Sequence, residues 1–121
     1  MFERKKTPQD LAGRTKRFAL RIVRLYAGLP QGIEAQEIGK QVVRCGTSVG
    51  AHYRQATRAR SNAEFTNKLE GGIQELEETA YWLELLGESG SVPPQRLTDL
   101  MAELNELIGI FETCVKTAGR R

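Results

Sequence analysis

Apolar side chains recur along this chain at intervals of three and four residues in four separate stretches, which is the pattern of amphipathic α-helices. We predict helices at about residues 8–27, 34–59, 62–86 and 93–116. Their apolar stripes begin at Leu11, Ile38, Phe65 and Leu97. No alternation of apolar and polar positions favours a β-strand over these helices.

Residues that favour turns and caps lie between the predicted helices. Residues 28–32 (GLPQG) and 87–94 (GESGSVPP) are typical of turns. Ser61 and Glu64 have the spacing of a capping box, which satisfies free amides at a helix start. Small side chains line one face of the second predicted helix and would let another helix approach closely; they are Gly39, Gly46, Gly50 and Thr57.

The connections between the four helices are short, so consecutive helices should pack antiparallel. The 121 residues are enough for one domain with its own hydrophobic core. The sequence therefore predicts a single all-α domain over residues 1–121, an antiparallel up-down-up-down four-helix bundle.

The formal net charge of +3 is unevenly distributed along the chain. Residues 1–60 contain thirteen Lys and Arg against four Asp and Glu, whereas residues 61–121 contain five against eleven. In a folded bundle this asymmetry either cancels through contacts between helices or subunits, or leaves a basic surface that faces a polyanion.

Basic side chains on the first two predicted helices are the candidate functional residues. Arginine and lysine bind phosphate oxygens and release counterions without reading base sequence. The candidates for nucleic-acid contact are Arg14, Arg17, Arg21, Arg24, Lys40, Arg44, Arg54, Arg58 and Arg60. These residues could instead form a solvated face, or pair with acidic third-helix residues of a neighbouring subunit. For Arg54 a structural hydrogen bond to Glu75 or Glu78 is a further alternative.

Catalytic and metal-binding arrangements are not recognisable in the sequence. His52 is the single histidine, one helical turn from Ser48 and two from Cys45, but no orienting acid or oxyanion donor is evident. We interpret it as a histidine at a helix edge. The acidic positions of the third helix lack the Glu-x-x-His pairs of carboxylate metal sites in bundles. We therefore predict no catalytic residue, no metal and no cofactor.

The N-terminus and the two cysteines indicate in which cellular compartment we expect the protein. The N-terminus is charged, without an apolar stretch of signal-peptide length, and no segment approaches the ~20 apolar residues of a membrane span. Cys45 and Cys114 both fall in predicted helices. We expect a cytoplasmic protein with both thiols free and no membrane partner.

Two segments resemble a known bacterial family. The run SVGAHYR at 48–54, together with Glu75, Glu78 and the box YWLELL at 81–86, resembles the four helix bundle protein family, which includes proteins encoded in intervening sequences of 23S rRNA genes. The resemblance covers about residues 18–86, although the family often has asparagine where this chain has His52. It implies a four-helix bundle and assembly as a homopentamer. For some relatives it implies an accessory role that binds nucleic acid and a reverse transcriptase in diversity-generating retroelements.

Tyr81, Trp82 and Leu85 lie outside the main apolar stripe of the third predicted helix and give it a second apolar surface. With the resemblance in view, we assign this surface to subunit contact. The alternative is that Trp82 only borders the core of its own subunit.

These observations favour a non-enzymatic, oligomeric protein that contacts RNA or DNA phosphates through a basic surface, independently of base sequence. The resemblance adds a role as an rRNA-associated or retroelement accessory factor. The alternative is an adaptor that binds a reverse transcriptase or another protein.

Overall fold

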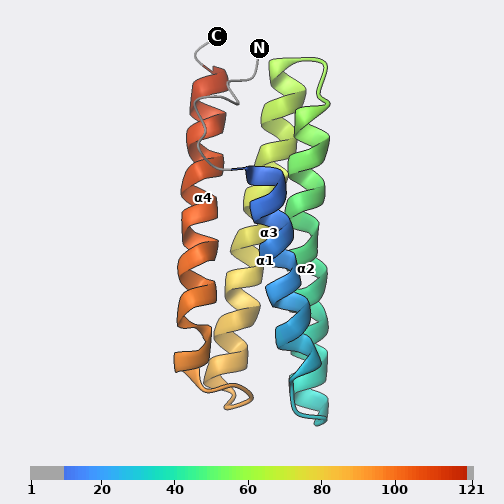
Figure 1. The fold of residues 1–121 in the computed structure, drawn as a ribbon, viewed down its shortest axis with the longest axis vertical. Helices are drawn as coiled ribbons and strands as arrows, with labels where there is room; N and C mark the ends of the chain where they lie inside the picture. Colours follow the sequence, from blue (N-terminus) through green and yellow to red (C-terminus); the bar gives the residue numbers. More distant parts are fainter. Residues whose placement is uncertain (1–9, 120–121) are drawn as a thin grey trace.

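The computed structural model describes residues 10–119, which form four long helices and one short 3-10 helix. They are α1 (Leu11–Ala27), α2 (Ile33–Thr57), α3 (Asn62–Glu88), η2 (Pro94–Leu97) and α4 (Thr98–Gly119). The turn between α2 and α3 lies at one end of the bundle, and the other two turns lie at the opposite end (Figure 1). Neighbouring helices therefore run antiparallel, and residues 10–119 contain no strand. The predicted all-α, up-down-up-down fold class is confirmed.

The ends of the helices differ from the prediction by a few residues. α2 ends at Thr57 instead of about residue 59, and α3 continues to Glu88. The predicted fourth helix starts as η2, with Pro94 in its first turn, and α4 follows at Thr98. The predicted start of the first helix at about residue 8 lies outside the described residues.

Caps found in the structure explain where two of the helices start. The side chain of Asp10 accepts a hydrogen bond from the Gly13 amide at the start of α1. Ser61 accepts one from the Glu64 amide at the start of α3, as the capping-box spacing predicted. The Glu64 carboxylate accepts from the amide of Arg60, one residue before the position expected for a capping box.

The core runs along the axis of the bundle and is formed by one face of each helix. Phe18, Ile22, Val49, Leu76 and Phe111 are all at most 1% exposed. On α4 the buried face includes Leu104 and Phe111 and extends to Leu100 and Leu107, whereas Met101 and Ile108 are half-buried.

Glycines of α2 let α1 pack closely against it. A Cβ atom at Gly46 would lie 2.9 Å from Cγ1 of Ile22, and one at Gly39 would lie 2.8 Å from Cδ1 of Tyr26. At Gly50 the nearest atom would be Oγ1 of Thr15 at 3.1 Å. The close helix approach predicted from the small-residue stripe is confirmed at these three glycines.

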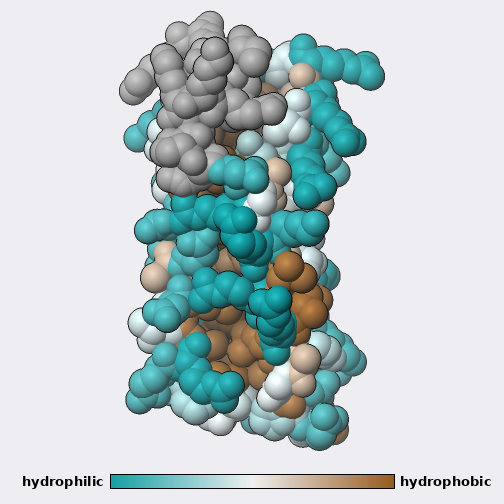
Figure 2. All heavy atoms as spheres, viewed as in Figure 1, coloured by the Kyte–Doolittle hydropathy of each residue, from teal (hydrophilic) through white to brown (hydrophobic). Residues whose placement is uncertain are grey.

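α1 is held mainly by α2, because its contact with α4 is much smaller than the contacts of the other neighbouring helices. Figure 2 shows the face on which α1 and α4 lie side by side. Hydrophilic side chains cover much of it, and apolar side chains are visible between the two helices in the lower half. Among the described residues, no helix is both long and apolar enough to cross a membrane.

Candidate functional site

Arg14, the first of the predicted basic candidates, joins α1 to α4. Its Nε atom lies 2.7 Å from Oε2 of Glu103 and its Nη2 atom 2.8 Å from Oε1 of the same carboxylate, and Nη2 also contacts Glu106. The Arg14 side chain is only 15% exposed. These hydrogen bonds lower the pKa of Glu103, an effect that burial opposes. Arg14 is therefore a structural ion-pair residue where α1 and α4 make few other contacts.

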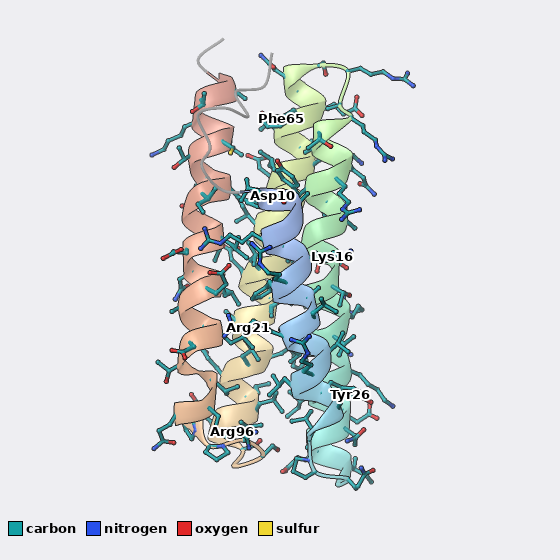
Figure 3. All side chains as sticks on the ribbon, in the orientation of Figure 1. Asp10, Lys16, Arg21, Tyr26, Phe65 and Arg96 are labelled. Atoms are coloured by element: carbon teal, nitrogen blue, oxygen red, sulfur yellow. The ribbon has the colours of Figure 1, made fainter. Side chains whose placement is uncertain are left out.

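The next three arginines of the same helix, Arg17, Arg21 and Arg24, are exposed and form no ion pair with another described residue. We call them the α1 row. Arg21 lies on the side of α1 that faces α4, whereas Lys16 lies on the opposite side (Figure 3). The positive charges of Arg21 and Arg17 also lower the pKa of Glu103 slightly, after the larger effect of Arg14. The α1 row keeps its hydrogen-bond donors available to a ligand.

The candidates on α2 divide into two groups. Lys40 pairs with Glu37 at 3.2 Å, and Nη2 of Arg44 lies 2.6 Å from Oε2 of Glu78. The others lie at the end of α2 and in the following turn, are exposed, and have no side-chain ion pair within residues 10–119; they are Arg54, Arg58 and Arg60. We call these three the turn cluster.

The structural alternative for Arg54, a hydrogen bond to Glu75 or Glu78, is wrong. Glu78 accepts from Arg44 and from Nε1 of Trp82, the latter at 3.3 Å. Glu75 faces His52 instead. Arg44 lies ten residues, nearly three helical turns, before Arg54 on α2. The sequence pattern alone did not determine which of the two arginines lies opposite the acidic residues of α3.

Between α2 and α3 the structure brings together two pairs of titratable side chains that the sequence pattern did not connect. Cys45 and His52 come from α2, and Glu75 and Glu78 come from α3; we call them the polar seam. His52 Nε2 lies 3.8 Å from Oε2 of Glu75, so the acid that the sequence did not reveal is next to the histidine. The seven-residue spacing of Cys45 and His52, and the three-residue spacing of the two glutamates, place each pair on one helix face. That spacing was the available signal, but it does not show that the two faces meet.

Burial and hydrogen bonding keep the Cys45 thiol protonated at neutral pH. Cys45 is completely buried, and desolvation raises its pKa to about 12, with a smaller contribution from its hydrogen bond to Glu78. Hydrogen bonds from Trp82, Cys45 and Arg44 lower the pKa of Glu78. Burial also raises the pKa of Cys114. Both cysteines are free, as predicted.

The predicted contact residues of α3 differ in their exposure. Tyr81 is 55% exposed, whereas Trp82 and Leu85 are half-buried. The ring of Trp82 packs on the core, and its ring centroid lies 5.1 Å from that of Tyr81 in an edge-on arrangement. Trp82 thus borders the core, and Tyr81 presents the larger apolar surface to solvent. Leu20 and Val23, which the sequence pattern did not single out, are 43% and 45% exposed on α1 beside the α1 row.

Comparison with known proteins supports the resemblance seen in the sequence. Residues 9–112 match the model of the 23S rRNA-intervening sequence protein family. A solved structure from Bacteroides thetaiotaomicron, described as a protein with unknown function from the S23 ribosomal protein family, is 34% identical and superimposes with a TM-score of 0.81. The match covers 87% of this chain and 97% of that chain. No curated protein matches this sequence. The fold, the solved neighbour and the family match together show that the chain belongs to the 23S rRNA-intervening sequence protein family.

Proposed function

We propose that this protein is a non-enzymatic, oligomeric nucleic-acid-binding protein that contacts RNA or DNA phosphates through the α1 row and the turn cluster. The proposal rests on one observation: the nine basic candidates fall into three that form ion pairs and six that form none within residues 10–119. Acidic side chains of the same chain pair with Arg14, Lys40 and Arg44. The six arginines of the α1 row and the turn cluster are exposed and form no such pair within residues 10–119.

Phosphate is the ligand that fits these arginines best. A guanidinium donates two parallel hydrogen bonds to phosphate oxygens, and each contact releases condensed counterions from the nucleic acid. The charges lie along a helix and at one end of the bundle, where they can follow a phosphate backbone without entering a groove. The family description connects these proteins with 23S rRNA, which supports rRNA as the first nucleic acid to test. The resemblance alone supports a second role, that of an accessory factor in a retroelement.

Fluorescence anisotropy with labelled single-stranded RNA, a 23S rRNA hairpin and duplex DNA would test the proposal. One variant carries Arg17→Gln, Arg21→Gln and Arg24→Gln, and a second carries the same change at the turn cluster. Glutamine avoids placing a new negative charge beside Glu103, which interacts with the α1 row. The matched control removes the same three charges from the other half of the chain, with Lys68→Gln, Arg96→Gln and Lys116→Gln.

We expect each arginine variant to bind at least about tenfold more weakly than the control, because three phosphate contacts are lost. Circular dichroism should show the same helicity for all variants, since none of the substituted arginines has an ion pair in the described structure. Equal loss of binding in all three variants would contradict the proposal, because net charge alone would then explain it. No binding by the wild type at low salt would also contradict it.

Exposed apolar side chains favour a second candidate function, that of an adaptor for a reverse transcriptase or another protein. Tyr81, Leu20 and Val23 are each at least 43% exposed. A protein contact centred on such residues would persist at high salt and would weaken when Tyr81 or Leu20 is replaced by serine. Nucleic-acid binding through arginine would weaken steeply with salt instead.

A further inference from the structure

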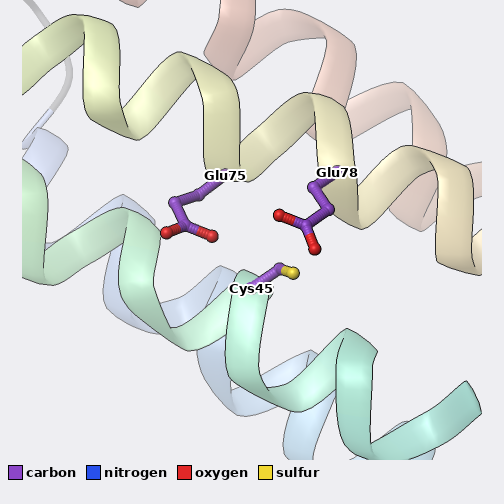
Figure 4. A group of neighbouring side chains, drawn as sticks. All are labelled: Cys45, Glu75 and Glu78. Carbon is purple, nitrogen blue, oxygen red and sulfur yellow. The ribbon is translucent and has the colours of Figure 1, made fainter.

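The polar seam between α2 and α3 has the composition of a metal-binding site. Cys45 of α2 lies opposite Glu75 and Glu78 of α3, and its sulfur atom points towards Glu78 (Figure 4). The Cys45 Sγ atom and one carboxylate oxygen from each glutamate all lie within 4.8 Å of one another. Thiolate and carboxylate are both ligands of zinc, and donor atoms at such spacing need only small shifts to reach one ion.

Two buried atoms of the seam have no hydrogen-bond partner within the described residues of the protein. These atoms are Oε1 of Glu75 and Nδ1 of His52. The other Glu75 oxygen lies 3.8 Å from His52 Nε2, which is beyond hydrogen-bond distance. Buried polar atoms without partners cost free energy, and they are uncommon unless an ion, a water or a ligand satisfies them.

The charges around the seam would balance with a divalent cation present. A Cys45 thiolate and the two carboxylates would carry three negative charges. One divalent ion and the guanidinium of Arg44, which lies 2.6 Å from Glu78, would carry three positive charges. A buried or half-buried group of charges is tolerated when it is neutral overall and every member is coordinated or hydrogen-bonded.

Packing holds the ligands in place and leaves a route for the ion. α2 and α3 form the most extensive helix pair of the bundle. Gly71 provides the space for the His52 ring, because a Cβ atom there would lie 2.7 Å from Cε1 of the imidazole. On the outer side, Glu78 is 43% exposed and Arg44 52% exposed, so an ion can enter from solvent along these two side chains.

We propose that Cys45, Glu75 and Glu78 form a binding site for one divalent transition-metal ion of the zinc type, with His52 as a positioning residue that moves from 3.8 Å to hydrogen-bond distance of Glu75 when the ion binds. On binding, the S–H bond of Cys45 breaks, a sulfur–metal bond forms, and one proton passes to solvent for each ion. No group is oxidised or reduced. A thiolate ligand favours Zn²⁺ or Co²⁺ over Mg²⁺ or Ca²⁺, which take oxygen ligands.

Titration of the metal-free protein with Co²⁺, followed by absorption spectroscopy, tests the proposal. We expect one Co²⁺ per chain, a thiolate-to-cobalt charge-transfer band in the near ultraviolet, and displacement of Co²⁺ by Zn²⁺. The band should disappear in the Cys45→Ser variant and persist in Cys114→Ser, which is the matched control because Cys114 is the other free cysteine. Glu75→Gln should weaken Co²⁺ binding by at least about tenfold.

His52→Ala should weaken Co²⁺ binding by about tenfold and leave the thiolate band intact, because a positioning residue acts on Glu75 and not on the sulfur. The wild-type titration decides the proposal even where Cys45→Ser fails to fold. Absence of the band at saturating Co²⁺ would overturn it, as would an equal band in the Cys45→Ser protein. Either result would make the seam a polar contact between two helices that holds no ion.

Discussion

Arg14 and Arg17 lie one turn apart on α1, but their surroundings differ. The Arg14 guanidinium holds the Glu103 carboxylate with two hydrogen bonds, and its side chain is 15% exposed. Arg17 is exposed and has no ion pair in the described part of the chain. The same residue type therefore stabilises the fold at one position and is available to a ligand at the next.

Arg14→Ala should lower the free energy of unfolding by about 1–3 kcal/mol, because it leaves the half-buried Glu103 without its partner. Arg17→Ala should change it by less than about 0.5 kcal/mol, as is usual for an exposed side chain. Urea unfolding of both variants and the wild type checks this prediction. Equal stability of the two variants would show that the Arg14 ion pair contributes little.

The same ion pair predicts how stability depends on pH. Hydrogen bonds from Arg14 hold the pKa of Glu103 below its ordinary value, so ionised Glu103 stabilises the fold at pH values above the pKa of about 4.3 expected in the unfolded chain. This contribution is lost as pH falls from about 4.3 through the lower, folded-state pKa. The stability difference between wild type and Glu103→Gln should be constant from pH 5 to 7 and shrink below about pH 4. A difference that does not change with pH would exclude this coupling.

At the scale of the elements, α2 is the helix on which the others depend. It packs most extensively against α3, and its glycines accept side chains of α1 at close range. Glycine normally destabilises a helix interior by up to about 1 kcal/mol relative to alanine. On the face of α2 that meets α1, the close packing that glycine allows stabilises the fold by more than this cost.

Two glycine substitutions separate helix propensity from packing. Gly46→Ala should destabilise the protein by about 1–3 kcal/mol, because its Cβ would lie 2.9 Å from the fully buried Ile22. Gly109→Ala on α4 should stabilise it by about 0.5–1 kcal/mol, since a Cβ there meets no atom within 4 Å. Thermal or urea unfolding of both variants is the measurement. Stabilisation by Gly46→Ala would contradict the close packing of α1 on α2.

The sequence predicted the features that depend on one helix alone, and it did not predict those that depend on how helices meet. Apolar spacing and capping residues are local, so they gave the four helices, the Ser61 cap and the glycine face of α2. Contacts between helices depend on register and rotation, which no single helix specifies. One alternative drawn from the sequence therefore paired Arg54 with the acidic residues of α3, whereas the structure pairs Arg44 with Glu78. It also did not reveal that Arg14 reaches Glu103, 89 positions further along the chain.

At the scale of the whole molecule, the basic first half and acidic second half neutralise each other only in part. The pairs of Arg14 with Glu103 and of Arg44 with Glu78 cross the two halves. The α1 row and the turn cluster are left with exposed charge. Composition predicted this imbalance, whereas only the folded structure separates the paired arginines from the exposed ones.

We propose that self-association involves the surface of α3 that contains Tyr81, which is 55% exposed. If Tyr81 lies in a subunit contact, Tyr81→Ser should lower the mass measured by light scattering, from a multiple of the 13.5 kDa chain towards the monomer. A homopentamer, which the resemblance implies, would have five times the chain mass. Leu20→Ser is the matched control for an exposed apolar residue on another helix. An unchanged mass for Tyr81→Ser would place the subunit contact elsewhere.

The salt dependence of nucleic-acid binding tests the central claim most directly. For wild type and the variant with glutamine at Arg17, Arg21 and Arg24, the logarithm of the association constant is measured against the logarithm of salt concentration. Each phosphate contact contributes about 0.7–0.9 to the steepness of this line, so the variant should have a slope shallower by about 2–3. The same slope for both proteins, or a wild-type affinity that does not fall with salt, would contradict phosphate binding by the α1 row.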